Sequence, residues 1–188
     1  MTRNAIVDAL GVLKAGRIVD LPHLVHPGIQ RFGPFPAMRT ETRYTVAESG
    51  FHVDAPEHFV EGRRTLERIE LEELMLPLFV LHFEDIDADG VAHCPGWGLD
   101  ALKYLFEERG VTAVGHEPLD TDGSADVRAR GFLDCEKYVL ESDHYQVEVM
   151  ANLDKLPSTG GVIFVGLPKF DKFPGFPVRA WAVVPNED

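Results

Sequence analysis

The stretch HVDAPEH, residues 52–58, gathers two histidines and two acids around one proline. Side chains two apart in extended backbone point to the same side, so His52 and Asp54 face one space. Pro56 keeps the residue before it extended and excludes a helix, and His58 lies beyond the resulting turn, where it can curl back. The stretch therefore predicts an extended segment and a turn that bring two imidazoles and a carboxylate together.

One imidazole and one carboxylate form half of the ligand shell of a divalent metal ion. Such an ion lowers the pKa of bound water to about 7. A second imidazole can carry protons, because its own pKa lies near neutrality. His58 is therefore the candidate catalytic residue, and Asp54 can bridge two ions if a second ion is present. The alternative is chance clustering, since the chain contains eight histidines.

The composition of the chain limits the classes of binding partner and the cellular location that we expect. Its 188 residues suffice for one domain with a sizeable core, so we expect a single domain over residues 1–188. The formal net charge of −13 disfavours nucleic acid and anionic membranes, and a small-molecule substrate suits it better. We find no signal peptide and no apolar run of membrane-spanning length. Two cysteines, Cys94 and Cys135, are expected to be free thiols, so a cytoplasmic location is predicted.

The order of the predicted elements indicates a mixed α/β domain. Helices are expected at residues 2–15, 65–76 and 97–110, with a helical turn at 136–141. Strands are expected at 17–21, 42–46, 77–83, 111–116, 145–150, 161–168 and 176–185. The clearest helix is 97–110, because its leucines and Phe106 line one face and Gly110 ends it.

The pattern H-x-D-A-P-x-H-F of residues 52–59 resembles the signature of the metal-dependent cyclase-like hydrolases. That family includes bacterial kynurenine formamidase and isatin hydrolase. Four further stretches resemble the family in the right order. They are IVDLPH (18–23), PGWGLDALKYLFEERGVTAVGHEPLDTD (95–122), EVMANLDKLP (148–157) and GLPKFDKFPGFPVRAWA (166–182).

The resemblance implies a swivelling β/β/α cyclase-like fold, in which a mixed sheet or small barrel is flanked by helices. It also implies a divalent metal ion, Mn²⁺ or Zn²⁺, with His58 as the catalytic histidine. The ligands that it implies are His52, Asp54, Glu148, Glu136 and Glu48. Glu48 stands where the family has its leading ligand histidine, and a carboxylate there favours Mn²⁺ over Zn²⁺. In a second alignment, YTVAESGFHV (44–53) matches the strand before the signature, and His52 is then no ligand.

The activity implied by the resemblance is hydrolysis of a cyclic or linear amide, isatin-like or formylkynurenine-like, by a metal-bound hydroxide. A homodimer or homotetramer is also implied. The interval 84–94 is shorter than the matching insert of relatives, which implies a shortened member. The alternative is a non-catalytic paralogue that binds a small molecule or acts as an oligomeric scaffold. A lyase or dehydratase that uses the same metal site is a third possibility.

The segment GHEPLDTD, residues 115–122, follows a predicted strand and carries two further acids, Asp120 and Asp122. It is either a loop that binds a second cation or a hydrogen-bonded turn. Glu148 lies on an alternating strand between two valines, where an acid requires a metal ion or a base as its partner. Glu136 lies at a predicted helix start, where the helix dipole alone favours an acid.

Overall fold

The computed structural model describes residues 9, 12–13, 15–20, 50–82, 95–169 and 172–185. Its strands are β1 (Arg17–Asp20), β2 (His52–Asp54), β3 (Met75–Leu78), β4 (Ala113–Gly115), β5 (Tyr145–Glu148), β6 (Gly161–Gly166), β7 (Gly175–Pro177) and β8 (Arg179–Val184). The α-helices are α2 (Leu99–Lys103), α3 (Ser124–Arg130) and α4 (Asp134–Glu141). Short helical segments are η1 (Pro56–His58), η2 (Leu66–Arg68), η3 (Leu71–Leu74), η4 (Tyr104–Glu108) and η5 (Leu153–Lys155).

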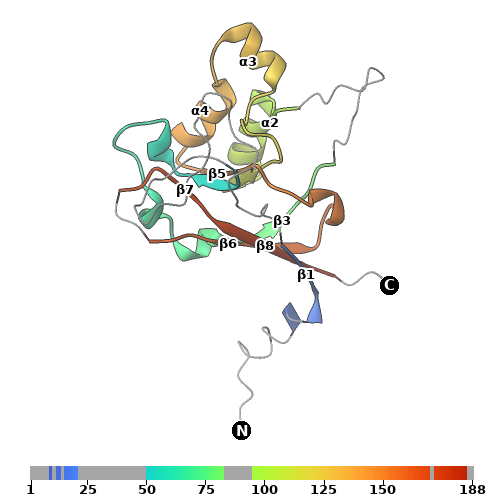
Figure 1. The fold of residues 1–188 in the computed structure, drawn as a ribbon. Helices are drawn as coiled ribbons and strands as arrows, with labels where there is room; N and C mark the ends of the chain where they lie inside the picture. Colours follow the sequence, from blue (N-terminus) through green and yellow to red (C-terminus); the bar gives the residue numbers. More distant parts are fainter. Residues whose placement is uncertain are drawn as a thin grey trace, which may run out of the picture.

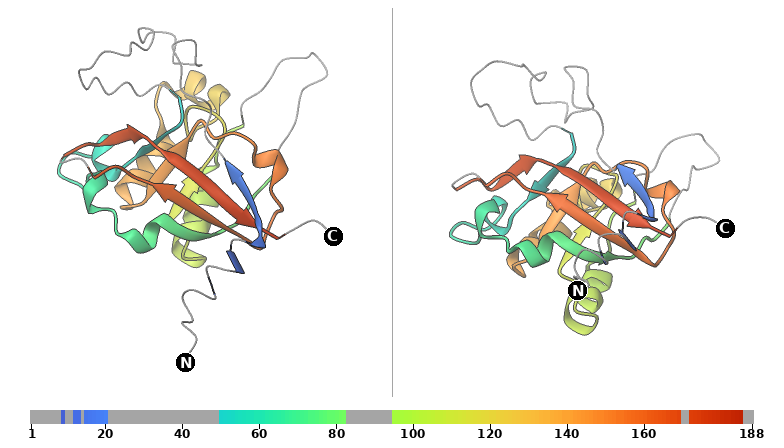
Figure 2. Two further views of the ribbon diagram at one scale, coloured as in Figure 1. Left: turned by 60° about the horizontal axis from the view of Figure 1, so that its bottom comes forward. Right: turned by 90° about the horizontal axis from the view of Figure 1, so that it is seen from below.

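Two four-stranded sheets carry the fold (Figures 1 and 2). The first sheet has the strand order β1-β8-β6-β3, and all its pairs are antiparallel. The second has the order β4-β5-β2-β7 and is mixed, because β4 and β5 run parallel and the other pairs are antiparallel. Neither sheet closes into a barrel among the described strands, so the mixed-sheet form of the predicted α/β fold is the one observed.

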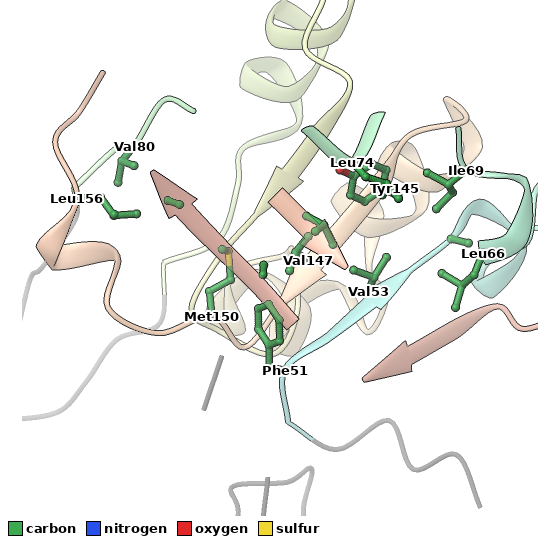
Figure 3. Close-up of a cluster of buried hydrophobic side chains, with 14 of the residues drawn as sticks. Phe51, Val53, Leu66, Ile69, Leu74, Val80, Tyr145, Val147, Met150 and Leu156 are labelled. Atoms are coloured by element: carbon green, nitrogen blue, oxygen red, sulfur yellow. The ribbon is translucent and has the colours of Figure 1, made fainter. Parts of the chain in front are cut away.

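The main apolar core lies between the two sheets, as Figure 3 shows around Val53 and Val147. These two valines come from β2 and β5 of the second sheet. Val165 on β6 and Ala182 on β8 belong to the same buried cluster. Because side chains alternate along a strand, the residues on either side of Val53 and Val147 point to the opposite face of the second sheet.

The helices cover that opposite face. In Figure 1, α2, α3 and α4 lie on the side of the second sheet away from β6 and β8. A second apolar cluster joins Leu102 of α2 and Val139 of α4 to Val114 of β4. The polar residues of β2 and β5 therefore lie between a sheet and a helix layer, where water is largely excluded.

The prediction of a helix over 65–76 is wrong, because the structure has no single continuous helix there. The structure has two 3₁₀ segments, η2 and η3, followed by β3, which starts two residues before the predicted strand at 77–83 and ends at Leu78. Leu66 and Ile69 are buried three residues apart, a spacing that suits the three-residue turn of a 3₁₀ helix. Leu74, which is also buried, belongs to the same main core, so the chain turns there instead of continuing one helix.

Two other elements differ from the sequence prediction. Helix α3 was not predicted, because none of its residues is buried and it shows no apolar period. The predicted strand over 176–185 is divided into β7 and β8, which pair in different sheets. The chain leaves one sheet at Pro177 and enters the other at Arg179, and no local pattern marks that transfer.

The helix predicted over 2–15 lies largely outside the described residues, and the other elements agree with the prediction within a few residues. The helix over 97–110 is present as α2 continued by the π-helical segment η4, and Gly110 takes the left-handed conformation with φ of 65°. The helical turn predicted at 136–141 is the last part of α4. Cys135 is a free, buried thiol, whereas Cys94, the strand predicted at 42–46 and the interval 84–94 lie outside the described residues. In the described part of the chain, no helix has the length and apolar character needed to cross a bilayer.

Candidate metal centre

Strand pairing brings the polar residues of β2 and β5 together on the helix-covered face. In the antiparallel register, His52 lies opposite Glu148 and Asp54 lies opposite Gln146. All four side chains are buried. The alternation of β2 was visible in the sequence, but the partner strand lies more than ninety positions further along the chain.

Three of these side chains form a group that can hold a metal ion. The Nε2 atom of His52 lies 3.3 Å from Oδ2 of Asp54 and 3.6 Å from Oε2 of Glu148. The Nδ1 atom of the same ring lies 2.8 Å from the carbonyl oxygen of Gly50. Nδ1 therefore carries the proton that it donates to this carbonyl, and the lone pair of Nε2 faces the two acids. One imidazole and two carboxylates with atoms within 4.8 Å of one another make a suitable ligand set.

His58 and Glu136 form a second group with Asp54. The segment η1 begins at Pro56 and turns the chain, so that Nδ1 of His58 lies 3.7 Å from Oδ1 of Asp54. The Nε2 atom of the same ring lies 3.9 Å from Oε1 of Glu136 in the first turn of α4. His58 therefore curls back over its own strand, and Asp54 belongs to both groups.

Asp54 is the centre of the arrangement and fits a cation. Its side chain is 1% exposed, and its Oδ1 atom is buried without a hydrogen-bond partner. Burial would raise the pKa of Asp54, but the hydrogen bond and charge of His52, with the charge of His58, lower it below its ordinary value. Gly175 lies opposite on β7, and a Cβ atom there would come within 2.6 Å of Oδ1. The site thus holds an ionised carboxylate with one oxygen unsatisfied, which is the donor that a divalent ion requires.

Gln146 orients the acids of the first group. Its Oε1 atom accepts a hydrogen bond of 2.7 Å from the hydroxyl of Thr121, so its amide nitrogen faces the carboxylates. That nitrogen donates to Oε1 of Glu148 at 2.8 Å and reaches Oδ2 of Asp54 at 3.4 Å. The amide therefore fixes two acidic side chains without adding charge.

Asp122 positions Glu136 through the start of α4. Its buried carboxylate accepts hydrogen bonds from the backbone N–H of Cys135 at 2.9 and 3.0 Å and from that of Glu136 at 2.9 Å. An acid at the first turn of a helix satisfies donors that have no partner within the helix. For Asp122, these bonds favour the hydrogen-bonded turn over the cation-binding loop. Asp120 is half-buried nearby, and burial and the charge of Asp122 raise its pKa.

In the second group, the surroundings of Glu136 shift its pKa. Burial raises the pKa of Glu136 to about 8, and the charges of Asp54, Asp120 and Asp122 add to the shift. In the metal-free protein this carboxyl group is therefore protonated at neutral pH. A cation beside it would reverse the shift and displace the proton.

We expect the Glu136→Gln variant to change the pH dependence of stability in the metal-free protein. Because the pKa of Glu136 is about 8 in the folded chain and 4.5 as a model value, folding favours its protonated form. That stabilising contribution is complete below pH 4.5 and is lost as the pH rises toward 8. The free energy of unfolding of the wild type should therefore fall relative to that of the variant, by about 1.4 kcal/mol per pH unit in this window.

Urea unfolding of both chelator-treated proteins at several pH values measures this difference. Parallel pH profiles for the two proteins would contradict the raised pKa of Glu136. Adding Mn²⁺ or Zn²⁺ should remove the wild-type loss of stability at the high end of the window, because the bound ion favours the ionised carboxylate.

Five of the six residues proposed from the sequence are thus brought together: His52, Asp54, His58, Glu136 and Glu148. Glu48 lies outside the described residues. The ligand roles of the five stay predictions, although their geometry suits them. The sequence analysis missed His116, which follows β4 and lies buried with its Nε2 atom 3.7 Å from Oε1 of Glu148. A signal was present, since His116 directly follows a predicted strand at the start of GHEPLDTD.

Comparison with known sequences finds partial matches. Residues 19–94 match a family described as "Putative cyclase". A curated relative, isatin hydrolase of Roseibium aggregatum, is 28% identical over 94 residues. The matched part covers 50% of this chain and 35% of that relative, so it spans about a third of the relative's length.

Solved structures share the fold over most of the chain. Isatin hydrolase A from Ralstonia solanacearum superposes with a TM-score of 0.77 and 21% identity, covering 98% of this chain and 99% of that one. A potential metal-dependent hydrolase with cyclase activity gives a TM-score of 0.66 and 19% identity, covering 91% and 99%. The fold and the site therefore define an α/β protein of the cyclase-like type, as predicted. The family match covers part of the chain, residues 19–94, and that part includes the pattern of residues 52–59.

Proposed function

We propose that this protein is a metal-dependent hydrolase whose centre is built on His52, Asp54 and Glu148. The observation that carries the proposal is Asp54, which belongs to both ligand groups and keeps one buried oxygen without a hydrogen-bond partner. The nitrogen and oxygen donors suit Mn²⁺ or Zn²⁺. When bound, such an ion polarises a substrate carbonyl and makes water acidic enough to attack at neutral pH.

The residues around the centre orient its ligands and exclude water. His52 is held in one tautomer by the carbonyl of Gly50, so its Nε2 atom stays directed at the centre. Gln146 keeps Glu148 in place on the other side. The helix layer and the second sheet exclude water around these groups, which strengthens their electrostatic effects.

His58 is proposed as the proton carrier. Its side chain is 23% exposed, whereas those of Asp54 and Glu136 are 1% and 5% exposed. It therefore stands between the buried acids and the solvent side of the centre. An imidazole in this position can take a proton from the attacking water and deliver it to the leaving group.

We propose a cyclic or linear amide as the substrate. Support comes from the relatives named isatin hydrolase and from the arrangement of a proton carrier beside a ligand group, which amide cleavage requires because the departing nitrogen must be protonated. A homodimer or homotetramer and a cytoplasmic location stay predictions of the sequence analysis.

Metal analysis combined with a His58→Ala variant tests the function. Elemental mass spectrometry of the purified protein should find about one equivalent of manganese or zinc, held by the group of His52, Asp54 and Glu148; a second equivalent, held by the group of Asp54, His58 and Glu136, would make His58 a ligand. Wild type should open a cyclic amide such as isatin, and His58→Ala should lower kcat by about 10²-fold to 10⁴-fold while the ion at His52 is kept.

His82→Ala is the matched control, because it removes an exposed histidine that belongs to neither ligand group. If His58→Ala also removes the ion at His52, His58 is a ligand and its role as proton carrier is wrong. If wild type holds no metal after reconstitution, the hydrolase proposal fails and the small-molecule-binding or scaffold alternative replaces it.

A further inference from the structure

His116 lies next to the site residues of β2 and β5, directly after the neighbouring strand β4. The parallel register of β4 and β5 pairs Gly115 with Val147. The backbone N–H of His116 continues this ladder and donates to the carbonyl of Val147 at 3.0 Å. His116 therefore comes beside Glu148, which itself lies opposite His52. His116, directly after β4, thus lies in line with Glu148 of β5 and His52 of β2 on the helix-covered face.

The side chain of His116 lacks the partners that a buried imidazole normally has. It is 8% exposed, and neither of its ring nitrogens makes a hydrogen bond. Buried polar atoms of this kind are rare and demand an explanation. In either protonation state, the imidazole ring has an N–H to donate.

Glu148 carries an acceptor close to this ring. Its Oε1 atom lies 3.7 Å from Nε2 of His116 and already accepts the amide N–H of Gln146. The other oxygen, Oε2, faces Nε2 of His52 inside the first ligand group. His116 is thus on the outer side of the carboxylate, and it belongs to neither group of converging ligand atoms. A donor on the outer oxygen prevents the carboxylate from rotating and keeps the inner oxygen directed at an ion.

The backbone holds His116 and Glu148 in a fixed relation. The carbonyls of His116 and Pro118 accept hydrogen bonds from Met150 at 2.9 Å and from Val149 at 3.2 Å. Val149 takes a positive φ of 56°, which is unfavourable for a β-branched residue and persists only where the surroundings impose it. The residue directly after Glu148 is therefore held by a backbone hydrogen bond to the segment that follows His116.

We propose that His116 is a positioning residue of the metal centre: its Nε2 atom, 3.7 Å from Oε1 of Glu148 in this structure, comes within hydrogen-bonding distance of that oxygen when an ion is bound and then holds the carboxylate in the orientation that ligates the ion. This inference rests on the proposed metal site. It concerns the affinity for the ion, and it adds no ligand to the ion and no proton carrier to the reaction. Partners of this kind typically change metal affinity by about 10-fold to 100-fold.

The variants His116→Leu and His116→Gln test the inference as a matched pair. Leucine fills the space of the ring without a donor, whereas the amide of glutamine can place an N–H near the position of Nε2. We expect His116→Leu to weaken Mn²⁺ or Zn²⁺ binding about 10-fold to 100-fold in chelator competition, and His116→Gln to restore it to within a few-fold of wild type. The visible spectrum of the Co²⁺-loaded protein should keep the same band intensities in both variants, since the ligands of the ion are unchanged.

Three results would overturn the inference. Unchanged metal affinity in His116→Leu would show that the donor does not matter. Equal weakening in both variants would show that the ring only fills space. A change in the Co²⁺ spectrum toward a lower coordination number would make His116 a direct ligand. If His116→Leu does not fold, His116→Asn replaces it, because the shorter amide cannot reach Oε1 and should remain weak where glutamine restores binding. Absence of metal from wild type would instead reject the proposed function.

Discussion

Replacing Asp54 by asparagine should abolish metal binding at both ligand groups and leave the fold in place. Asparagine keeps the shape of the side chain, so its packing beside Gly175 and Gln146 is preserved. It removes the negative charge that His52 and His58 share, and with it the only acid common to the two groups. We expect metal affinity to fall by more than about 100-fold, since loss of a ligand exceeds the effect of losing a ligand's partner.

Chelator competition and elemental analysis measure this loss, and circular dichroism of the metal-free proteins checks that the fold is kept. Asp154→Asn is the matched control, because it makes the same change at an exposed position in η5. It should bind metal as wild type does. Retention of one full equivalent by Asp54→Asn would contradict the central place of Asp54, because an ion would then be held without it.

Replacing Gly96 by alanine should unfold or strongly destabilise the protein. A Cβ atom at this position would lie 1.8 Å from the backbone nitrogen of Gly123 and 2.2 Å from the backbone carbon of Asp122. These are main-chain atoms, so no side-chain rotation can relieve the overlap. The displaced segment contains Asp122, whose carboxylate accepts hydrogen bonds from the first turn of α4, and Thr121, which orients Gln146. We expect a loss of about 3 kcal/mol or more in the free energy of unfolding, together with loss of the metal centre.

Gly98→Ala is the matched control for this prediction. It lies two residues further along, and a Cβ atom there would have no neighbour within 4 Å. Gly98 is the N-cap of α2, where alanine costs about 1 kcal/mol or less relative to glycine. Urea unfolding of the three metal-free proteins gives the comparison. Equal stability of the Gly96 and Gly98 variants would show that the contact of Gly96 with residues 121–123 is not as close as the structure describes.

Part of the centre follows from local chain chemistry. Residues 52–58 contain a proline that excludes a helix and a His-x-Asp pair that alternation places on one face, and both effects act within a few residues. The structure accordingly has β2 followed by the short segment η1, with His52, Asp54 and His58 converging. The helix over 97–110 was equally predictable, because its apolar residues repeat at helical spacing and Gly110 ends it.

Other parts of the fold carry no local signal. Helix α3 buries none of its residues, so no apolar period marks it. The strand predicted over 176–185 changes sheets between β7 and β8, because β7 pairs with β2 and β8 pairs with β1 and β6. The segment 65–76 has acids between its leucines at positions compatible with a helix. Its conformation instead follows from the burial of Leu66, Ile69 and Leu74 in the main core.

The sequence by itself determined the extended, proline-ended strand and the three side chains that it gathers. Only the tertiary structure decided which other groups complete the centre. The antiparallel register of β2 and β5 places Glu148 opposite His52. The parallel register of β4 and β5 places His116 beside Glu148. Helix α4 carries Glu136 to within 3.9 Å of His58. Register is set by long-range pairing and by burial of Val53 and Val147 on the other face, and a shift of one residue would turn the acids into the core. Such pairing joins strands far apart in the chain, so local periodicity cannot reveal it.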